Sequence, residues 1–386
     1  MSFCLAPELL TALYVTILER AGVSGQGDCV TTAYLNSIAT AVPPHDVHEA
    51  FVAFAGSQLD GDNRRAAIFN RLVDRDGIDH RYSCLAPGSD PANGAVDADG
   101  IYARGQFPDT AKRMRLFEMH APVLAARAVE KLNLGSQRDS ITHLVVTCCT
   151  GFSAPGIDLE IVERCGLSPS VERTMVGFMG CYAAMNALKL GRHIVRSEPD
   201  ARVLVVNLEL CTLHMKETAD LEQILSFLIF ADGCSASLIS SEPEGFALDS
   251  FHAVLAPDTA SLITWNIGDS GFDMVLSGRV PGAIQETLST RGPEILRGAA
   301  VCDIDLWAVH PGGRTVLDAV ERALQLGPQA LAASREVLRR FGNMSSATVM
   351  FVLESMLLSA PKEKAGCAMA FGPGLVAETM LFRSGR

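Results

Sequence analysis

Short apolar runs separated by helical patterns are the feature that most limits how this chain can fold. They cover residues 142–150, 201–211 and 234–241 and read THLVVTCCT, ARVLVVNLELC and CSASLISS. Near-continuous apolar runs are typical of strands covered on both faces, and intervening helices permit such burial. The pattern therefore predicts an α/β protein with buried mixed sheets.

A second region of the same kind follows the polar segment SSEPEG at residues 240–245, which is the best internal boundary in the chain. Beyond it come a short strand in LWAVHP (306–311), a helix from about 314 to 326 and the run SREVLRRFGNMSSATVMFVLESMLL (334–358). The chain closes with two strand-like runs, GCAMAFGPG and LVAETMLFR. The order of these elements predicts a second α/β region.

Charge and cysteine usage exclude several classes of function. The net charge of the 386 residues is −12 and no Lys/Arg run exceeds two residues, so the basic surface of a nucleic-acid binder is missing. We therefore expect small-molecule partners. The eleven cysteines are scattered without C-x-x-C pairs. This spacing indicates reduced thiols in the cytoplasm and neither a disulfide framework nor a metal site.

Residues 1–31 are expected to form an extension before the folded unit. The segment MSFCLAPELLTALYVTILERAG is apolar, but Glu8 and Glu19 interrupt it, and no basic leader or cleavage site is present. It is predicted to be a short amphipathic helix and neither a signal peptide nor a membrane span. Its role is not evident from the sequence.

Cys181 lies between Gly180 and what is predicted to be a buried helix, in TMVGFMGCYAAMNALKLGRHIV (174–195). In the first turn of a helix, unpaired N–H groups and the helix dipole stabilise a thiolate relative to a thiol. Cys181 is therefore a candidate nucleophile. The alternative is a buried core cysteine that behaves as a small apolar residue.

Two further residues have settings suited to chemistry. His310 closes the strand LWAV and precedes PGG, so a sharp turn holds its imidazole at a strand end. The alternative is a structural histidine with satisfied hydrogen bonds. Asn343 follows Gly342 at the start of an apolar helix, where it can serve as an N-cap. Its amide could instead donate to an oxyanion, together with an imidazole N–H.

Two segments share a form. MGCYAAM (179–185) and FGNMSSA (341–347) each have a glycine, a polar residue, a bulky residue and two small residues before an apolar helix. Two halves built alike would place Cys181 and Asn343 at equivalent helix starts facing one cleft. A fourth motif, FGPG (371–374), lacks the Lys-Ser/Thr of a P-loop and the spacing of a dinucleotide fingerprint, so it predicts a tight turn and no nucleotide site.

Taken in order, GFMGCYAAM, HPGGR, GNMSSA and FGPG resemble the type III polyketide synthases, the chalcone-synthase superfamily with the thiolase fold. The resemblance extends from about residue 32 to 384. The sequences of these motifs are most similar to those of the bacterial branch that makes alkylpyrones and alkylresorcinols. It implies a five-layered αβαβα core with two related halves, residues 32–242 carrying the cysteine and residues 243–386 carrying the histidine and asparagine. It also implies a homodimer.

The resemblance assigns an acyltransferase chemistry. Cys181 would carry the acyl group from an acyl-CoA starter, and malonyl-CoA would extend it by decarboxylative Claisen condensation to alkyl α-pyrones or alkylresorcinols. His310 would be the imidazolium partner of the thiolate. His310 and Asn343 would both donate to the thioester or enolate oxygen. The chemistry requires no metal and no redox cofactor.

Cavity residues are carried over in the same way. Phe230 matches an aromatic gatekeeper between the coenzyme A tunnel and the cavity, and Met274 stands where plant enzymes have a second aromatic residue. Trp265 stands where plant chalcone synthases have a glycine. Arg71 and Arg75 match coenzyme A contacts, with a solvated surface pair as the alternative. The remaining candidate substrate contacts are Cys149, Thr150, Cys211, His214, Ser345, Phe371, Gly372 and Pro373. Ala370 replaces the first glycine of the usual GFGPG turn.

Three other functions stay open at this point. A ketoacyl-ACP synthase-like condensing enzyme shares the Cys/His/Asn chemistry but would take a malonyl carrier protein. A cysteine acyl hydrolase would use the same nucleophile and release a free acid. An inactive dimeric binding protein would need none of these three residues. The starter, the number of extensions and the mode of cyclisation depend on cavity volume and do not follow from the motifs.

Overall fold

A computed structural model describes residues 31–59 and 61–385 of the chain. The N-terminal extension expected at residues 1–31 therefore lies outside the described residues, apart from Thr31. Within the described part, no helix is both long enough and apolar enough to cross a membrane. The division at residue 242 falls in the connection between strands β7 and β8 and stays a prediction.

The first half builds its sheet from the apolar runs identified above. Its strands are β1 (Tyr34–Ala41), β4 (His143–Cys148), β5 (Glu172–Gly177), β6 (Val203–Leu210) and β7 (Asp232–Ser240). Every residue of β4, β6 and β7 is buried, as continuous apolar runs predict. The main helices are α4 (Thr110–Lys131), α5 (Ile157–Cys165) and α6 (Ala183–Ser197).

The second half contains β8 (Phe246–Leu255), β11 (Leu306–Val309), β12 (Ala365–Gly372) and β13 (Val376–Ser384). Its helices are α8 (Val280–Ile295), α9 (Arg314–Leu324), α10 (Ala332–Phe341) and α11 (Thr348–Ser359). A separate hairpin, β9 (Ile263–Gly268) and β10 (Gly271–Leu276), forms a two-stranded sheet. Smaller elements complete the fold: α2 (His48–Ser57), α3 (Asn63–Val73), α7 (Leu221–Ile229) and the pair β2 (His45–Asp46) and β3 (Tyr82–Ser83).

The main strands form one mixed sheet in the order β11-β12-β13-β8-β1-β7-β6-β4-β5. Strand β4 runs parallel to β5 and β6, and β11 runs parallel to β12, while the other neighbours are antiparallel. The two halves of the sheet join only where β1 pairs with β8, through Tyr34 with Ala247 and Leu35 with Phe246. Such a short junction lets the halves separate and take helices between them.

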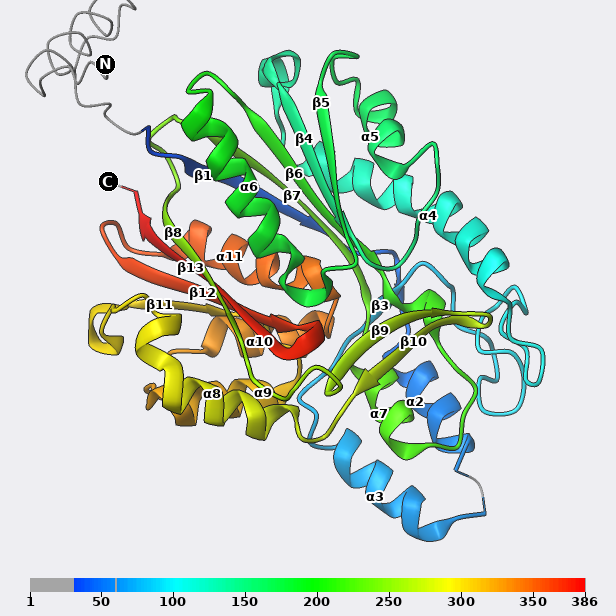
Figure 1. Cartoon of the computed structure of the whole chain (residues 1–386). Coiled ribbons are helices and arrows are strands. Elements are labelled where there is room, and N and C mark those ends of the chain that lie inside the picture. The colour runs from blue at the N-terminus through cyan, green and yellow to red at the C-terminus, as the bar shows by residue number, and fades with distance from the viewer. Residues whose placement is uncertain (1–30, 60, 386) are drawn as a thin grey trace, which may run out of the picture. The chain divides into compact units, whose positions relative to one another are not determined.

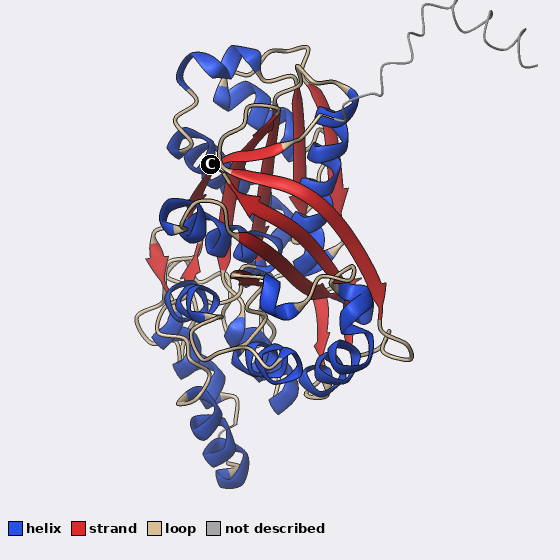
Figure 2. Cartoon of the chain, turned by 90° about the vertical axis from the view of Figure 1, so that its left-hand side faces the viewer, coloured by secondary structure: helices blue, strands red, loops and turns tan. Residues whose placement is uncertain are grey.

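The expected five layers are present (Figure 1). Helix α4 covers β1, β6 and β7 on one outer side, and α8 packs on β8, β13 and α9 on the other. Helices α6 and α11 lie between, since α6 contacts both β6 and β13 and α11 contacts both β1 and β11. Figure 2 shows the same strands from the side, with helices on both outer faces. The αβαβα architecture predicted from the sequence is confirmed.

The predicted internal similarity also appears in the local structure. A 3-10 turn, Gly180–Tyr182, precedes α6, and another, Ser345–Ala347, precedes α11. Gly180 and Gly342 have φ values of 70° and 67°, a left-handed conformation that glycine adopts without a Cβ penalty. One expectation needs correction. Cys181 and Asn343 stand ahead of their α-helices and not in the first α-helical turn, because the tighter turns come first.

Candidate active site

The turn that carries Cys181 is packed tightly against the β12–β13 turn of the second half. A Cβ atom on Gly180 would lie 2.3 Å from Cδ of Pro373, and one on Gly372 would lie 2.7 Å from Cδ1 of Tyr182. Both distances are far below a van der Waals contact. Glycine at these two positions therefore brings the FGPG turn to the candidate nucleophile.

Asn343 is fixed by its backbone and by its side chain. Its N–H donates to the carbonyl of Ile229 (2.8 Å), and its carbonyl accepts from the N–H of Ala231 (2.9 Å). Its Oδ1 accepts from the N–H of Ser345 (2.8 Å), and its Nδ2 donates to the carbonyl of Gly312 (3.4 Å). The side chain thus stabilises the turn before α11 and directs its amide nitrogen toward the segment after His310. The N-caps of that turn and of α11 are Met344 and Ala347, so the N-cap alternative for Asn343 is wrong.

His310 directly follows β11, where its N–H donates to the carbonyl of Met369 on β12 (2.7 Å). The residue is only 1% exposed, yet neither ring nitrogen has a hydrogen-bond partner among the described residues. Buried polar atoms of native proteins are almost always paired, so both nitrogens stand available to a ligand. The alternative of a structural histidine with satisfied hydrogen bonds is wrong.

The three candidates are linked through Ser345 and Gly312. The thiol of Cys181 donates to Oγ of Ser345 (3.8 Å), and the side chains of Ser345 and Asn343 both act to lower the pKa of that thiol. Asn343 in turn bonds to Gly312, whose own position is close to the His310 ring, since a Cβ there would lie 3.7 Å from Nε2. Within the described part of the chain, no hydrogen bond joins Cys181 to His310.

Burial opposes both charges of the expected thiolate–imidazolium pair. It raises the pKa of Cys181 to about 12 and lowers the pKa of His310 to about 3. The backbone N–H of Cys181 lowers the thiol pKa, as expected at a helix start, but burial outweighs it. Each charged form is therefore disfavoured on its own.

Glu209 is a further ionisable group beside the site that the sequence reasoning did not select. It is fully buried on β6 and accepts from the Cys149 N–H (3.0 Å), Oγ1 of Thr150 (2.9 Å) and Oγ of Ser346 (2.6 Å). Burial raises its pKa to about 7 despite these bonds. Its charge acts to raise the pKa of Cys181. A glutamate inside the apolar run VLVVNLEL was the available signal.

Most of the expected substrate contacts line a single small cavity of about 30 Å³ around Cys181. Two residues missed from the sequence, Phe227 and Ile263, also line it. Such a volume holds only one or two water molecules, so side chains must move before a substrate enters. The expected residues on the cavity wall are Cys149, Thr150, Cys211, Phe230, Trp265, Met274, Ser345 and Pro373.

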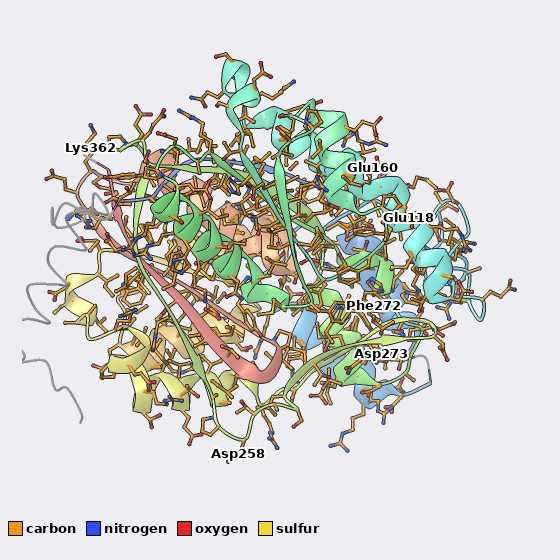
Figure 3. The ribbon with its side chains drawn as sticks, turned by 45° about the horizontal axis from the view of Figure 1, so that its top comes forward. Glu118, Glu160, Asp258, Phe272, Asp273 and Lys362 are labelled. Atoms are coloured by element: carbon orange, nitrogen blue, oxygen red, sulfur yellow. The ribbon has the colours of Figure 1, made fainter. Side chains whose placement is uncertain are left out.

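Trp265 is held firmly on this wall. Its Nε1 donates to the carbonyl of Cys149 (2.7 Å), and its ring meets those of His214 and Phe272 edge-on, with centroids 5.3 and 5.6 Å away. Met274 lies opposite Trp265 in the β9–β10 pair. Figure 3 marks Phe272 and Asp273, neighbours on β10 whose side chains are respectively buried and half exposed.

Three expected contacts lie off the cavity wall. His214 stacks on Phe272 at 4.1 Å, its Nε2 donates to the Thr150 carbonyl (2.7 Å) and its Nδ1 accepts from the Phe272 N–H (3.0 Å). Burial lowers its pKa to about 3, so His214 is neutral. It packs edge-on against the Trp265 ring, which lines the cavity. Phe371 packs in the apolar core of the second half, and Gly372 lies beneath Tyr182.

Two other cavities adjoin the site. The entrance cavity, about 520 Å³, lies between α7, α9 and the segment after α3, and its wall includes Arg75, Arg314 and Gly312. Arg71 is exposed on α3 and does not line it. The side cavity, about 30 Å³, lies between α2 and α7 and is lined by Phe51, Phe54 and Ile224. It shares Cys211, Phe227 and Phe230 with the cavity at Cys181.

The buried charge of Glu209 yields a testable pH effect. In Glu209→Gln the negative charge is absent, the Cys181 thiolate is less disfavoured and the thiol pKa falls. Alkylation of Cys181 by iodoacetamide should then be about threefold to tenfold faster between about pH 7 and 9, where Glu209 is ionised in the parent. The measurement is the alkylation rate against pH, by intact-protein mass.

Glu354→Gln serves as the control, because Glu354 is a partly buried carboxylate on α11 that accepts from Thr40 and lines none of the three cavities. Its alkylation profile should match that of the parent. An unchanged or slower rate in a folded Glu209→Gln protein would show that Glu209 does not act on the thiol.

Comparison with known proteins identifies the family to which these features belong. The model of the chalcone and stilbene synthase N-terminal domain matches residues 24–243, and that of the C-terminal domain matches residues 248–385. The Alpha-pyrone synthesis polyketide synthase-like Pks18 of Mycobacterium tuberculosis is 34% identical over 366 residues, which cover 91% of each chain.

Solved structures agree. PKS-I from the brown alga Ectocarpus siliculosus has a TM-score of 0.81 at 28% identity, with 93% of this chain and 100% of that chain covered. A type III pentaketide synthase from Neurospora crassa has a TM-score of 0.78 at 25% identity, with 91% and 99% covered. The chain therefore belongs to the chalcone and stilbene synthase family and is a type III polyketide synthase, a condensing enzyme of the acyltransferase class.

Proposed function

We propose that this enzyme loads an acyl-CoA starter onto Cys181 and extends it with malonyl-CoA to alkyl α-pyrones or alkylresorcinols. The observation that carries the proposal is a Cys181 thiol in a largely apolar cavity, linked through Ser345, Asn343 and Gly312 to a buried imidazole whose two nitrogens are unpaired among the described residues. The name of the mycobacterial relative, which refers to α-pyrone synthesis, supports the pyrone products.

Loading of the starter begins with a proton transfer. As Cys181 attacks the thioester carbon, its proton passes to the free nitrogen of His310, and the thiolate of coenzyme A leaves. Because burial disfavours each charge alone, the thiolate and imidazolium arise as a pair at the moment of attack. The entrance cavity is lined by Arg75 and Arg314 and also by Asp76, Glu222 and Asp318. We propose that the two guanidinium groups bind the coenzyme A phosphates, with exposed Arg71 further out on α3.

Chain extension requires an enolate. Malonyl-CoA loses CO₂, and the resulting negative oxygen accepts hydrogen bonds from His310 and from Nδ2 of Asn343. The enolate carbon attacks the acyl group on Cys181 and displaces the thiolate. Buried Phe230, bridged to Asn343 through the backbone, places an apolar wall beside this oxygen site.

The apolar surroundings favour a linear alkyl starter. Trp265 is fixed by its hydrogen bond and ring contacts, whereas Met274 is unbranched and adaptable. Displacement of Phe227 would join the cavity at Cys181 to the side cavity, whose walls are mainly aromatic and aliphatic. A flexible chain can follow this bent path, while a bulky aromatic starter cannot.

We further propose that the enzyme works in the cytoplasm without a metal or redox cofactor. Claisen condensation driven by loss of CO₂ transfers no electrons to an acceptor and needs only the acid, base and nucleophile described above. All nine cysteines among the described residues are free thiols, which fits a reducing compartment.

A homodimer through the β5 edge completes the proposal. Strand β5 ends the sheet, and most of its residues are exposed. Phe152, which lies against Gly177 at the end of β5, and Met175 are both 39% exposed, and nearby Leu159 on α5 is 41% exposed. An open strand edge with apolar side chains is a surface that a second copy can cover.

The proposed roles of Cys181 and Asn343 can be tested separately, because starter loading and malonyl-CoA decarboxylation are measured as two half-reactions. Cys181→Ala should form no acyl-enzyme from acyl-CoA. Asn343→Ser keeps a hydroxyl that can accept the Ser345 N–H bond but lacks the amide donor, so it should load the starter and decarboxylate malonyl-CoA about 10²–10³ times more slowly. Intact-protein mass measures loading, and CO₂ release measures decarboxylation.

Asn93→Asp, in an exposed loop, is the control and should behave as the parent in both assays. A stable acyl adduct on Cys181→Ala would remove Cys181 from its role. Equal loss of both half-reactions in Asn343→Ser would make Asn343 a structural residue only.

Product length tests the role of Trp265. Trp265→Gly should enlarge the elongation space and shift products toward one more malonyl unit, with little change in starter loading. Trp265→Phe loses the bond to Cys149 but keeps most of the bulk, so it should retain the parent's product length. Products from linear acyl-CoA starters and labelled malonyl-CoA are identified by mass. The same lengths from the glycine variant, or a parent that prefers aromatic starters, would contradict this placement.

The dimer is tested by light scattering on the eluting protein. The parent should have twice the 41.2 kDa chain mass, and Phe152→Arg with Met175→Arg should shift it to the single-chain mass, because two buried charges oppose association. Leu358→Arg places the same change on an exposed position of α11 and should leave the dimer intact. A monomeric parent, or a dimer unaffected by the double variant, would refute the β5 interface.

A further inference from the structure

A separate cavity of about 350 Å³, here called the α6–β8 cavity, lies near the C-terminal end of α6. Helix α6 contributes Lys189, Arg192, His193 and Arg196, whose spacing of three and four residues puts them on one helix face. Residues 249–251 of β8 and Arg297, which follows α8, complete the wall. Figure 1 shows α6 beside β8. None of these residues lines the three cavities at and around Cys181.

The carboxylate on the wall of this cavity, Asp249, forms a two-pronged ion pair with Arg383, with both distances 2.8 Å. Lys189 is paired with Glu378 at 3.3 Å. No carboxylate among the described residues forms an ion pair with Arg192, Arg196 or Arg297. Arg192 donates to the carbonyls of Leu248 and Asp249 (2.7 Å each), and the charge of Asp249 acts on it as well. The cavity wall therefore carries more positive than negative charge.

Arg297 follows the C-terminal end of helix α8. Its φ of 52° is left-handed, as is common just after a helix C-terminus, and its N–H donates to the carbonyl of Glu294 (3.0 Å) while that of Gly298 donates to Pro293 (2.7 Å). Its guanidinium donates to the Phe251 carbonyl (3.2 Å). The end of α8 thus brings this cation to the cavity wall.

The titration of the cluster is consistent with unneutralised positive charge. Burial lowers the pKa of His193, and Arg192, Arg196 and Lys189 lower it further. Burial also lowers the pKa of Arg192, and Arg196 and Arg297 add to the shift, while Asp249 partly opposes it. These cations repel one another in a chain whose net charge is −12. An anion between them would relieve the repulsion.

We propose that the α6–β8 cavity binds a small ligand that carries two or more phosphate groups. Guanidinium groups bind phosphate oxygens through paired, charge-assisted hydrogen bonds, and three of them around one cavity match a multiply charged anion better than a single carboxylate. The volume is in the range of small-molecule sites. This site is distinct from the entrance cavity, where Arg75 and Arg314 belong to other elements.

Calorimetric titration with inorganic pyrophosphate and with ADP, at constant ionic strength, tests the proposal. The parent should bind at least one of them saturably below about 1 mM. Arg196→Gln and Arg297→Gln, made singly, should each weaken that binding about tenfold or more, because each removes a charge-assisted pair. Tighter binding of ADP than of pyrophosphate would identify a nucleotide as the ligand class, and the reverse order an inorganic polyphosphate.

Arg340→Gln is the matched control, because Arg340 is an exposed arginine of α10 that lines none of these cavities, and its affinity for the probe should equal that of the parent. Arg75→Gln reports binding of the probe at the entrance cavity. Loss of binding in Arg75→Gln with parent-like binding in Arg196→Gln and Arg297→Gln would place the phosphate at the entrance and overturn the proposal. Absence of saturable binding of both probes to the parent would overturn it as well.

Discussion

The contact of Gly180 with Pro373 is the constraint on which the active site depends. It joins the turn before α6 in the first half to the β12–β13 turn in the second half, and it leaves no room for a Cβ on either Gly180 or Gly372. Because β12 also pairs with β11, the same strand that ends in the FGPG turn positions the N–H of His310 through Met369. One strand of the second half therefore places the histidine and closes the wall beside the cysteine.

Enclosure decides the electrostatics of this site more than helix geometry does. The 3-10 turn separates Cys181 from α6, and the loss of water raises the thiol pKa to about 12, while buried Glu209 opposes a thiolate further. Burial likewise lowers the pKa of His310, whose ring nitrogens are unpaired among the described residues. Both groups of the proposed thiolate–imidazolium pair therefore rest uncharged near neutral pH.

Sequence patterns predicted the architecture well, because strands buried on both faces leave continuous apolar runs such as those of β4, β6 and β7. The similarity of MGCYAAM and FGNMSSA was readable because a left-handed glycine and small residues are needed at both turns. The upward shift of the Cys181 pKa was not predictable from the sequence, since it depends on burial by segments distant in the chain. Phe227 and Ile263 were missed for a related reason, because each lies within an ordinary apolar run and only the packing of α7 and β9 brings it to the cavity. Glu209 was readable as a charge inside an apolar strand, but its effect on Cys181 depends on how β6 packs.

The direction in which a chain can grow follows from which side chains are free to move. The cavity at Cys181 is about 30 Å³, so elongation must displace part of its wall. Trp265 resists displacement through its bond to Cys149 and its contacts with His214 and Phe272, and Pro373 is fixed by Gly180. Phe227 is only partly buried on α7, and beyond it lies the apolar side cavity. We therefore expect a growing linear chain to displace Phe227 and extend toward α2 and α7.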